Sequence, residues 1–144
     1  MSPIAKPDWQ HLIPHRGGMS LLDTVVDWDD ARIHLSAISH RDPDNPLRND
    51  DQLRALHLCE YGAQAMAVHG GLLAQRDGKV AAPGLLVSLR AVQLHVARID
   101  DLPGALDVHA EKLLDSGSSW QYAFRVAHQD RLLAEGRAAV MHMA

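Results

Sequence analysis

The sequence contains a single cysteine, Cys59, among its 144 residues. One cysteine cannot form an intrachain disulfide or supply a pair of metal-binding thiolates, so we expect no disulfide framework and a reducing, cytoplasmic location. An excess of positive charge is also missing, because 14 lysine and arginine residues stand against 18 aspartate and glutamate residues and give a formal net charge of −4. Nucleic-acid-binding proteins normally have a basic face, so we do not expect nucleic acid as a partner.

Long apolar runs are absent as well. No segment approaches the ~18 apolar residues that a membrane-spanning helix needs. Residues 1–18 contain no long apolar region, so we expect no secretory signal there. The 10 histidines are scattered along the chain, whereas a metal site needs several ligands close together. We therefore expect no metal ion and no other cofactor.

The composition that remains is typical of one globular domain, which we assign to residues 1–144. Hydrophobic residues make up 47% of the chain and charged residues 22%. Strands before and after a central helix are predicted by short segments rich in apolar and β-branched residues. In several of these segments apolar and polar residues alternate. The expected strands are 21–30, 31–38, 85–99, 105–115, 119–129 and 131–143.

The central segment has apolar residues at helical spacing from Leu53 to Val68, with Asn49 or Asp50 as a candidate cap and Gly78 as the expected end. This helix is apolar nearly all round, so we expect it to be buried. Strands and helices do not alternate along the chain, which argues against a parallel sheet. The predicted fold is α+β: an antiparallel sheet wrapped around one long central helix, the hotdog fold.

Two features of the middle of the chain suggest a function. Glu60 lies in an apolar stretch, with His57 one helical turn before it and Gln64 one turn after it. A buried carboxylate is costly unless it is paired, hydrogen-bonded or protonated. The polar loop 40–51, which contains two prolines, is also longer than an ordinary connection requires.

Three stretches resemble the bacterial 3-hydroxyacyl-(acyl carrier protein) dehydratases of the FabZ/FabA type. They are IPHRGGMSLLDTV (13–25), CEYGAQAMA (59–67) and LPGAL (102–106). The stretch EYGAQAMAVHG is similar to a divergent branch of such dehydratases that is associated with aryl polyene pigments. The resemblance implies a hotdog enzyme that dehydrates a 3-hydroxyacyl thioester carried on acyl carrier protein or coenzyme A. It also implies a homodimer, a higher oligomer, or a heteromer with a paralogous hotdog subunit.

The resemblance places Glu60 at the family's catalytic acid and Gln64 at its glutamine. We expect Gln64 to bind the substrate together with Ala55, Leu56 and His57. The family's catalytic histidine lies in a loop fourteen residues before the acid, where this sequence has Pro46 next to Asn45. The nearest histidine upstream of that position is His40. Arg54 and Ala55 stand where the family has a Pro-Gly pair at the start of its helix.

Dehydration of a 3-hydroxyacyl thioester requires a base, an acid and a donor that stabilises charge on the thioester oxygen. Glu60 is the expected acid, and backbone N–H groups near Ala55 and Leu56 are the expected donors. His40 is a candidate base, and Asn45 can orient a group but cannot take a proton. His57 shares a helix face with Glu60, so it is either a second candidate base or a hydrogen-bond partner of the carboxylate.

Two other functions fit the same residues. A hotdog thioesterase would use Glu60 with Asn45, Asp42 or Asp44 to position water. A catalytically degenerate subunit would support an active paralogue, and this role would also explain the missing loop histidine.

The candidate contacts for an acidic carrier protein or its phosphate are basic side chains: Arg41, Arg48, Arg76, Lys79 and Arg90.

Overall fold

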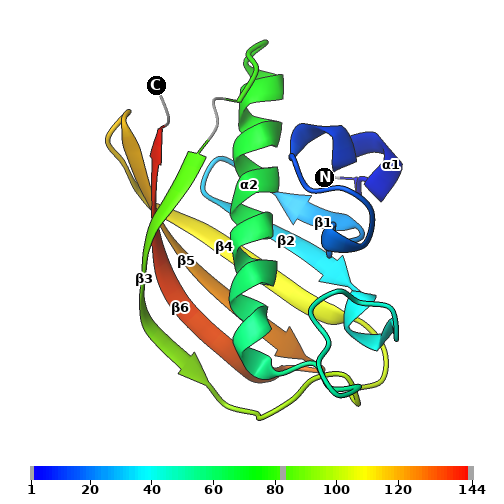
Figure 1. The fold of residues 1–144 in the computed structure, drawn as a ribbon. Coiled ribbons are helices and arrows are strands. Elements are labelled where there is room, and N and C mark those ends of the chain that lie inside the picture. Colours follow the sequence, from blue (N-terminus) through cyan, green and yellow to red (C-terminus); the bar gives the residue numbers. More distant parts are fainter. Residues whose placement is uncertain (1, 82–83, 143–144) are drawn as a thin grey trace.

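The computed structural model describes residues 2–81 and 84–142. Its central feature is a six-stranded antiparallel sheet with the strand order β1-β2-β4-β5-β6-β3. One long helix, α2 (Leu58–Arg76), lies across the concave side of this sheet (Figure 1). The strands are β1 (Val25–Trp28), β2 (Arg32–Ala37), β3 (Gly84–Leu94), β4 (Leu106–Asp115), β5 (Ser119–His128) and β6 (Arg131–His142). This arrangement confirms the predicted hotdog architecture.

The expected turns between strands are present. Asp29 forms the β1–β2 turn by accepting hydrogen bonds at its Oδ1 from the backbone amides of Ala31 and Arg32, at 2.8 and 2.9 Å. Gln129 and Asp130 both have positive φ, 49° and 68°, as expected for a two-residue hairpin turn between long strands. β1 is shorter than predicted: it spans Val25–Trp28, although backbone hydrogen bonds of Asp23 and Thr24 with Ser36 continue toward its start.

The helix begins later than its spacing predicted. Asp50 and Asp51 have positive φ, 53° and 59°, which α-helices do not tolerate. The amide of Leu53 donates to Oδ1 of Asp100 at 2.9 Å, and the amide of Ala55 donates to the carbonyl of Ala97 at 3.1 Å. A 3₁₀ turn, Ala55–His57, then leads into α2. The chain before Ala55 is therefore held by contacts with the segment after β3, and it cannot join the helix.

The core lies between α2 and the sheet, and two close approaches fix the helix in it. A Cβ atom on Gly62 would lie 2.6 Å from the ring of Phe124 on β5. A Cβ atom on Gly71 would lie 2.8 Å from Cβ of Leu12, in the N-terminal segment on the other side of the helix. Glycine at both positions lets neighbouring elements come closer than any other residue would allow.

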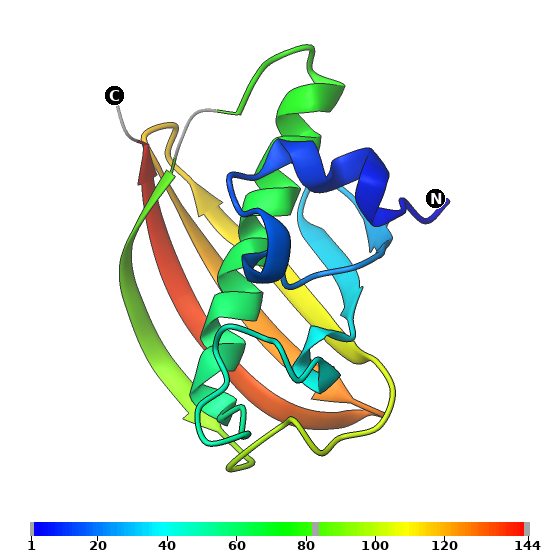
Figure 2. The same ribbon diagram turned by 45° about the vertical axis from the view of Figure 1, so that its right-hand side comes forward.

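The N-terminal segment covers the side of α2 that faces away from the sheet (Figure 2). It contains a short helix, α1 (Lys6–Trp9), and two 3₁₀ turns, Gln10–Leu12 and Gly17–Met19. The buried Trp9 ring donates its Nε1–H to the carbonyl of Asp23 at 2.7 Å. A backbone bridge between Ile4 and Val25 covers the β1 edge of the sheet.

The opposite edge strand, β3, is exposed along its length. Five of its large apolar side chains are 41–53% exposed, and three of them occupy the consecutive positions 85–87, so both faces of this part of the strand are apolar. They are Leu85, Leu86, Val87, Leu89 and Leu94. An uncovered apolar edge strand is a template for pairing with another chain.

Candidate functional site

Glu60 lies in the first turn of α2, with its side chain 36% exposed. It is therefore accessible, and not fully enclosed as its apolar surroundings in the sequence had indicated. Gln64, one turn further along the helix, donates its Nε2–H to Oε1 of Glu60 at 3.1 Å. This contact holds the carboxylate in one orientation without neutralising it.

Gln64 is completely buried and connects α2 to the N-terminal segment. Its Nε2 also donates to the carbonyl of Met19 at 2.7 Å, and its Oε1 accepts from the amide of Leu21 at 2.9 Å. One side chain thus satisfies two backbone groups of the segment and orients Glu60. The resemblance placed Gln64 at the site as a substrate-binding residue, and the structure places it beside the carboxylate.

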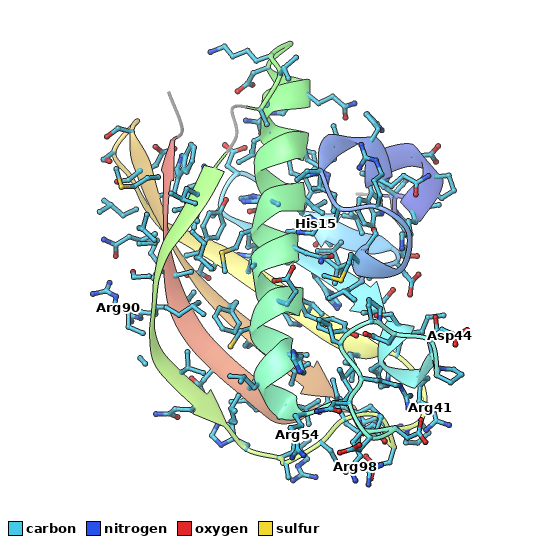
Figure 3. The ribbon with its side chains drawn as sticks, in the orientation of Figure 1. His15, Arg41, Asp44, Arg54, Arg90 and Arg98 are labelled. Atoms are coloured by element: carbon cyan, nitrogen blue, oxygen red, sulfur yellow. The ribbon has the colours of Figure 1, made fainter. Side chains whose placement is uncertain are left out.

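The N-terminal segment brings a further side chain to Glu60. Nε2 of His15 lies 3.4 Å from Oε1 of Glu60, and the His15 side chain is 28% exposed. The other ring nitrogen, Nδ1, is buried without a hydrogen-bond partner among the described residues. Figure 3 shows His15 alongside α2. Sequence reasoning included His15 in the IPHRGG stretch but did not assign it to the site, because no local spacing relates it to Glu60.

His40 occupies a different environment. Its side chain is completely buried, and its Nε2 lies 3.0 Å from the carbonyl oxygen of Leu102. Burial is the main reason that the pKa of His40 is lowered from its ordinary value. Within the described residues no contact links His40 to Glu60. The assignment of His40 as the base stays a prediction, and it needs a second subunit or a rearranged loop.

Asn45 is also buried, and its side chain is used inside its own loop. Nδ2 donates to the carbonyl of Ser39 at 2.9 Å and lies 3.4 Å from the hydroxyl of Tyr61, while Oδ1 accepts from the amide of Leu47 at 2.9 Å. These contacts fix the loop against the helix residue that follows Glu60. The orienting role predicted for Asn45 stays a prediction.

The start of the helix requires one correction. The amide of Ala55 donates to the carbonyl of Ala97 at 3.1 Å, so it is not free to bind a thioester oxygen as predicted. Leu56 is 61% exposed and His57 is partly buried. Substrate contacts at Leu56 and His57 stay predictions.

The basic side chains proposed as carrier contacts are widely separated. Arg41 donates to the carbonyl of Asp100 at 3.1 Å, near the start of α2, whereas Arg76 is the last residue of that helix and pairs with Asp30. Figure 3 shows Arg41, Arg54 and Arg98 at the same end of the molecule. Arg54 and Arg98 are joined by a backbone bridge, and sequence reasoning missed both because they belong to different segments.

Two classes of feature are not found in the described part of the chain. No group of three or more histidine, cysteine, aspartate and glutamate side chains there is placed to hold a metal ion. No helix within residues 2–81 and 84–142 is long and apolar enough to cross a membrane.

Several solved structures share this fold. The dehydratase heterocomplex ApeI:P from Xenorhabdus doucetiae matches with a TM-score of 0.82 and 22% identity, over 94% of this chain and 90% of the other. A hypothetical thioesterase with coenzyme A from Streptococcus pneumoniae matches with a TM-score of 0.66 and 10% identity, over 97% and 98%. The PaaI protein of the E. coli phenylacetic acid degradation operon matches with a TM-score of 0.59 and 12% identity, over 82% and 81%. Identities this low establish the fold alone.

No curated protein matches the sequence. The model of one family, the ApeP-like family described as ApeP dehydratase, matches residues 7–144. This range includes the whole sheet, the central helix and the carboxylate with its two neighbours. The chain therefore belongs to the ApeP-like dehydratase family.

Proposed function

We propose that this dehydratase converts a 3-hydroxyacyl thioester to the 2-enoyl thioester, with Glu60 as the acid that protonates the departing hydroxyl. The observation that carries the proposal is the accessible Glu60 carboxyl group, which is held by Gln64 and faces a histidine at 3.4 Å. Elimination of water needs an acid and a base near adjacent carbon atoms of the substrate. A carboxyl group and an imidazole ring 3.4 Å apart, both partly exposed, meet this requirement.

The acyl group would arrive on the phosphopantetheine arm of an acyl carrier protein, or on coenzyme A, which has the same arm. Both bring phosphate groups, and a carrier protein brings an acidic surface. Arg41, Arg54 and Arg98 lie at the end of the molecule where α2 begins, and Glu60 is in the first turn of that helix (Figure 3). Arginine binds phosphate well because its planar guanidinium group offers paired donors. This end of the molecule is therefore the proposed carrier contact.

The protein would function with a second hotdog subunit paired along β3. That strand is an uncovered edge whose exposed side chains are largely apolar, and pairing would bury them and satisfy its free backbone groups. The Xenorhabdus doucetiae structure is described as a heterocomplex, so the second subunit could be a related hotdog chain as well as another copy of this one. In either case the assembly is at least dimeric.

The test is to incubate the protein, with any subunit that co-purifies, with a 3-hydroxyacyl thioester and to follow enoyl absorbance and free thiol together. Formation of the enoyl product without thiol release supports the proposal. Thiol release without enoyl product would replace it with thioester hydrolysis, the activity that a hotdog thioesterase would have. If neither product forms, even from a substrate on carrier protein, the chain is identified as a supporting subunit of an active paralogue.

A further inference from the structure

We propose that His15 is the general base of the reaction and works with Glu60 of the same subunit. This inference rests on the proposed dehydration of a 3-hydroxyacyl thioester. It assigns a catalytic role to a residue of the N-terminal segment, and it places the acid and the base of the site on one chain.

The position of His15 is fixed by contacts on both sides of it. Arg16 folds back, so that its Nη1 donates to the carbonyls of Ile13 and His15. Further along, Gln64 holds the carbonyl of Met19 and the amide of Leu21. The same Gln64 side chain contacts Glu60. Gln64 therefore holds the acid directly and, through Met19 and Leu21, holds the segment that carries the base, which is the kind of support that a catalytic pair requires.

The ring of His15 presents one nitrogen for chemistry. Nδ1 is buried without a partner in the described part of the chain, whereas Nε2 faces Oε1 of Glu60 at 3.4 Å. With 28% of the His15 side chain and 36% of the Glu60 side chain exposed, a substrate can reach both groups. The separation is slightly long for a hydrogen bond, as is common for catalytic pairs before substrate binds.

The reaction balances with these two groups alone. Nε2 of His15 takes a proton from the α-carbon, and the electrons of that C–H bond form the new carbon–carbon double bond. The bond between the β-carbon and the hydroxyl oxygen breaks as Glu60 gives its proton to that oxygen, and water leaves. The proton on His15 then passes to Glu60 across the contact that joins them, which restores both groups without another reactant.

The other candidate bases are placed less favourably. His40 is completely buried and directs Nε2 at the carbonyl of Leu102, so it would have to leave that position to reach a substrate. His57 is one turn before Glu60 on the helix, and the described contacts of Glu60 are to His15 and Gln64. His15 is thus the histidine that already lies against the acid.

The test compares His15→Ala with the wild-type protein in the enoyl assay, with and without added imidazole. His11→Ala is the matched control, since His11 is an exposed histidine of the same segment. General bases typically contribute about 10²–10⁴-fold, so His15→Ala should lower kcat at least ~100-fold. Free imidazole should restore at least ~10-fold of this loss, because it can replace a missing proton acceptor in a partly exposed site. His11→Ala should stay within about twofold of wild type, since it removes no group of the acid–base pair.

Each outcome has one consequence. If His15→Ala stays within about threefold of wild type, His15 is not the base, although the proposed function stands. A large loss that imidazole leaves unchanged assigns His15 to structure alone and also overturns the inference. If the wild-type protein itself forms no enoyl product, the proposed function fails, and this inference fails with it.

Discussion

The backbone amide of Leu21 donates to Oε1 of Gln64 at 2.9 Å, across 43 residues of sequence. This contact attaches the N-terminal segment to the central helix at the position where Glu60 and His15 meet. Gln64 therefore belongs to the helix and also supports the site.

Gln64→Ala should destabilise the protein by about 2–4 kcal/mol, because it leaves the Leu21 amide and the Met19 carbonyl without their partner in a buried place. Urea unfolding measures this change. Gln75→Ala is the matched control, since Gln75 is an exposed glutamine on the same helix. Equal stability of the two variants would contradict the two backbone contacts described for Gln64.

The adjacent glycines of α2 should respond in opposite directions to alanine. Gly70 has open space where a Cβ atom would lie, so Gly70→Ala should stabilise the protein by about 0.5–1 kcal/mol through helix propensity. A Cβ atom on Gly71 would lie 2.8 Å from Cβ of Leu12, so Gly71→Ala should destabilise it by about 1–3 kcal/mol. Thermal unfolding of both variants is the measurement. Shifts of the same sign would mean that Leu12 does not pack as described.

Much of the fold could be predicted because its signals are local. Each signal involves only residues that are close in sequence: the alternation of apolar and polar residues in β2, the apolar surface of α2, and the turn residues between strands. The start of the helix could not be predicted, because Leu53 and Ala55 are held by Asp100 and Ala97, which follow β3. The role of Glu60 followed from the resemblance. Its contact with His15 depends on the bonds of Gln64 to Met19 and Leu21, which no local pattern encodes.

The exposed β3 edge should be required for assembly. Val87→Lys and Leu89→Lys place charges on an apolar edge strand, where lysine opposes pairing. Both variants should sediment as smaller species than the wild-type protein. Leu114→Lys serves as the control, because Leu114 is 55% exposed but lies on β4. A wild-type protein that is strictly monomeric at micromolar concentration would contradict the proposed pairing.

Stability should fall as the pH falls below about 6.5, where unfolded histidine becomes protonated. Burial, and then the neighbouring His34 and Arg125, lower the pKa of His109 to about 4. The unfolded chain therefore binds a proton between these two values that the folded chain does not, and stability rises with pH across this window. Burial also lowers the pKa values of His40 and His69, so they act in the same direction.

Urea unfolding at pH 7 and pH 5 should reveal this loss, and His109→Gln should reduce it, because glutamine does not titrate. An identical loss in the variant and the wild-type protein would mean that His109 makes no contribution.

The most direct test of the account is the rate of enoyl formation by Glu60→Gln. The change keeps the size of the side chain and removes the proton that the hydroxyl needs, so kcat should fall at least ~100-fold while the unfolding temperature is retained. Glu111→Gln, at an exposed glutamate on β4, should leave the rate unchanged. A Glu60→Gln rate within about threefold of wild type, a barrier change under ~0.7 kcal/mol, would make Glu60 a structural residue and contradict the proposed chemistry.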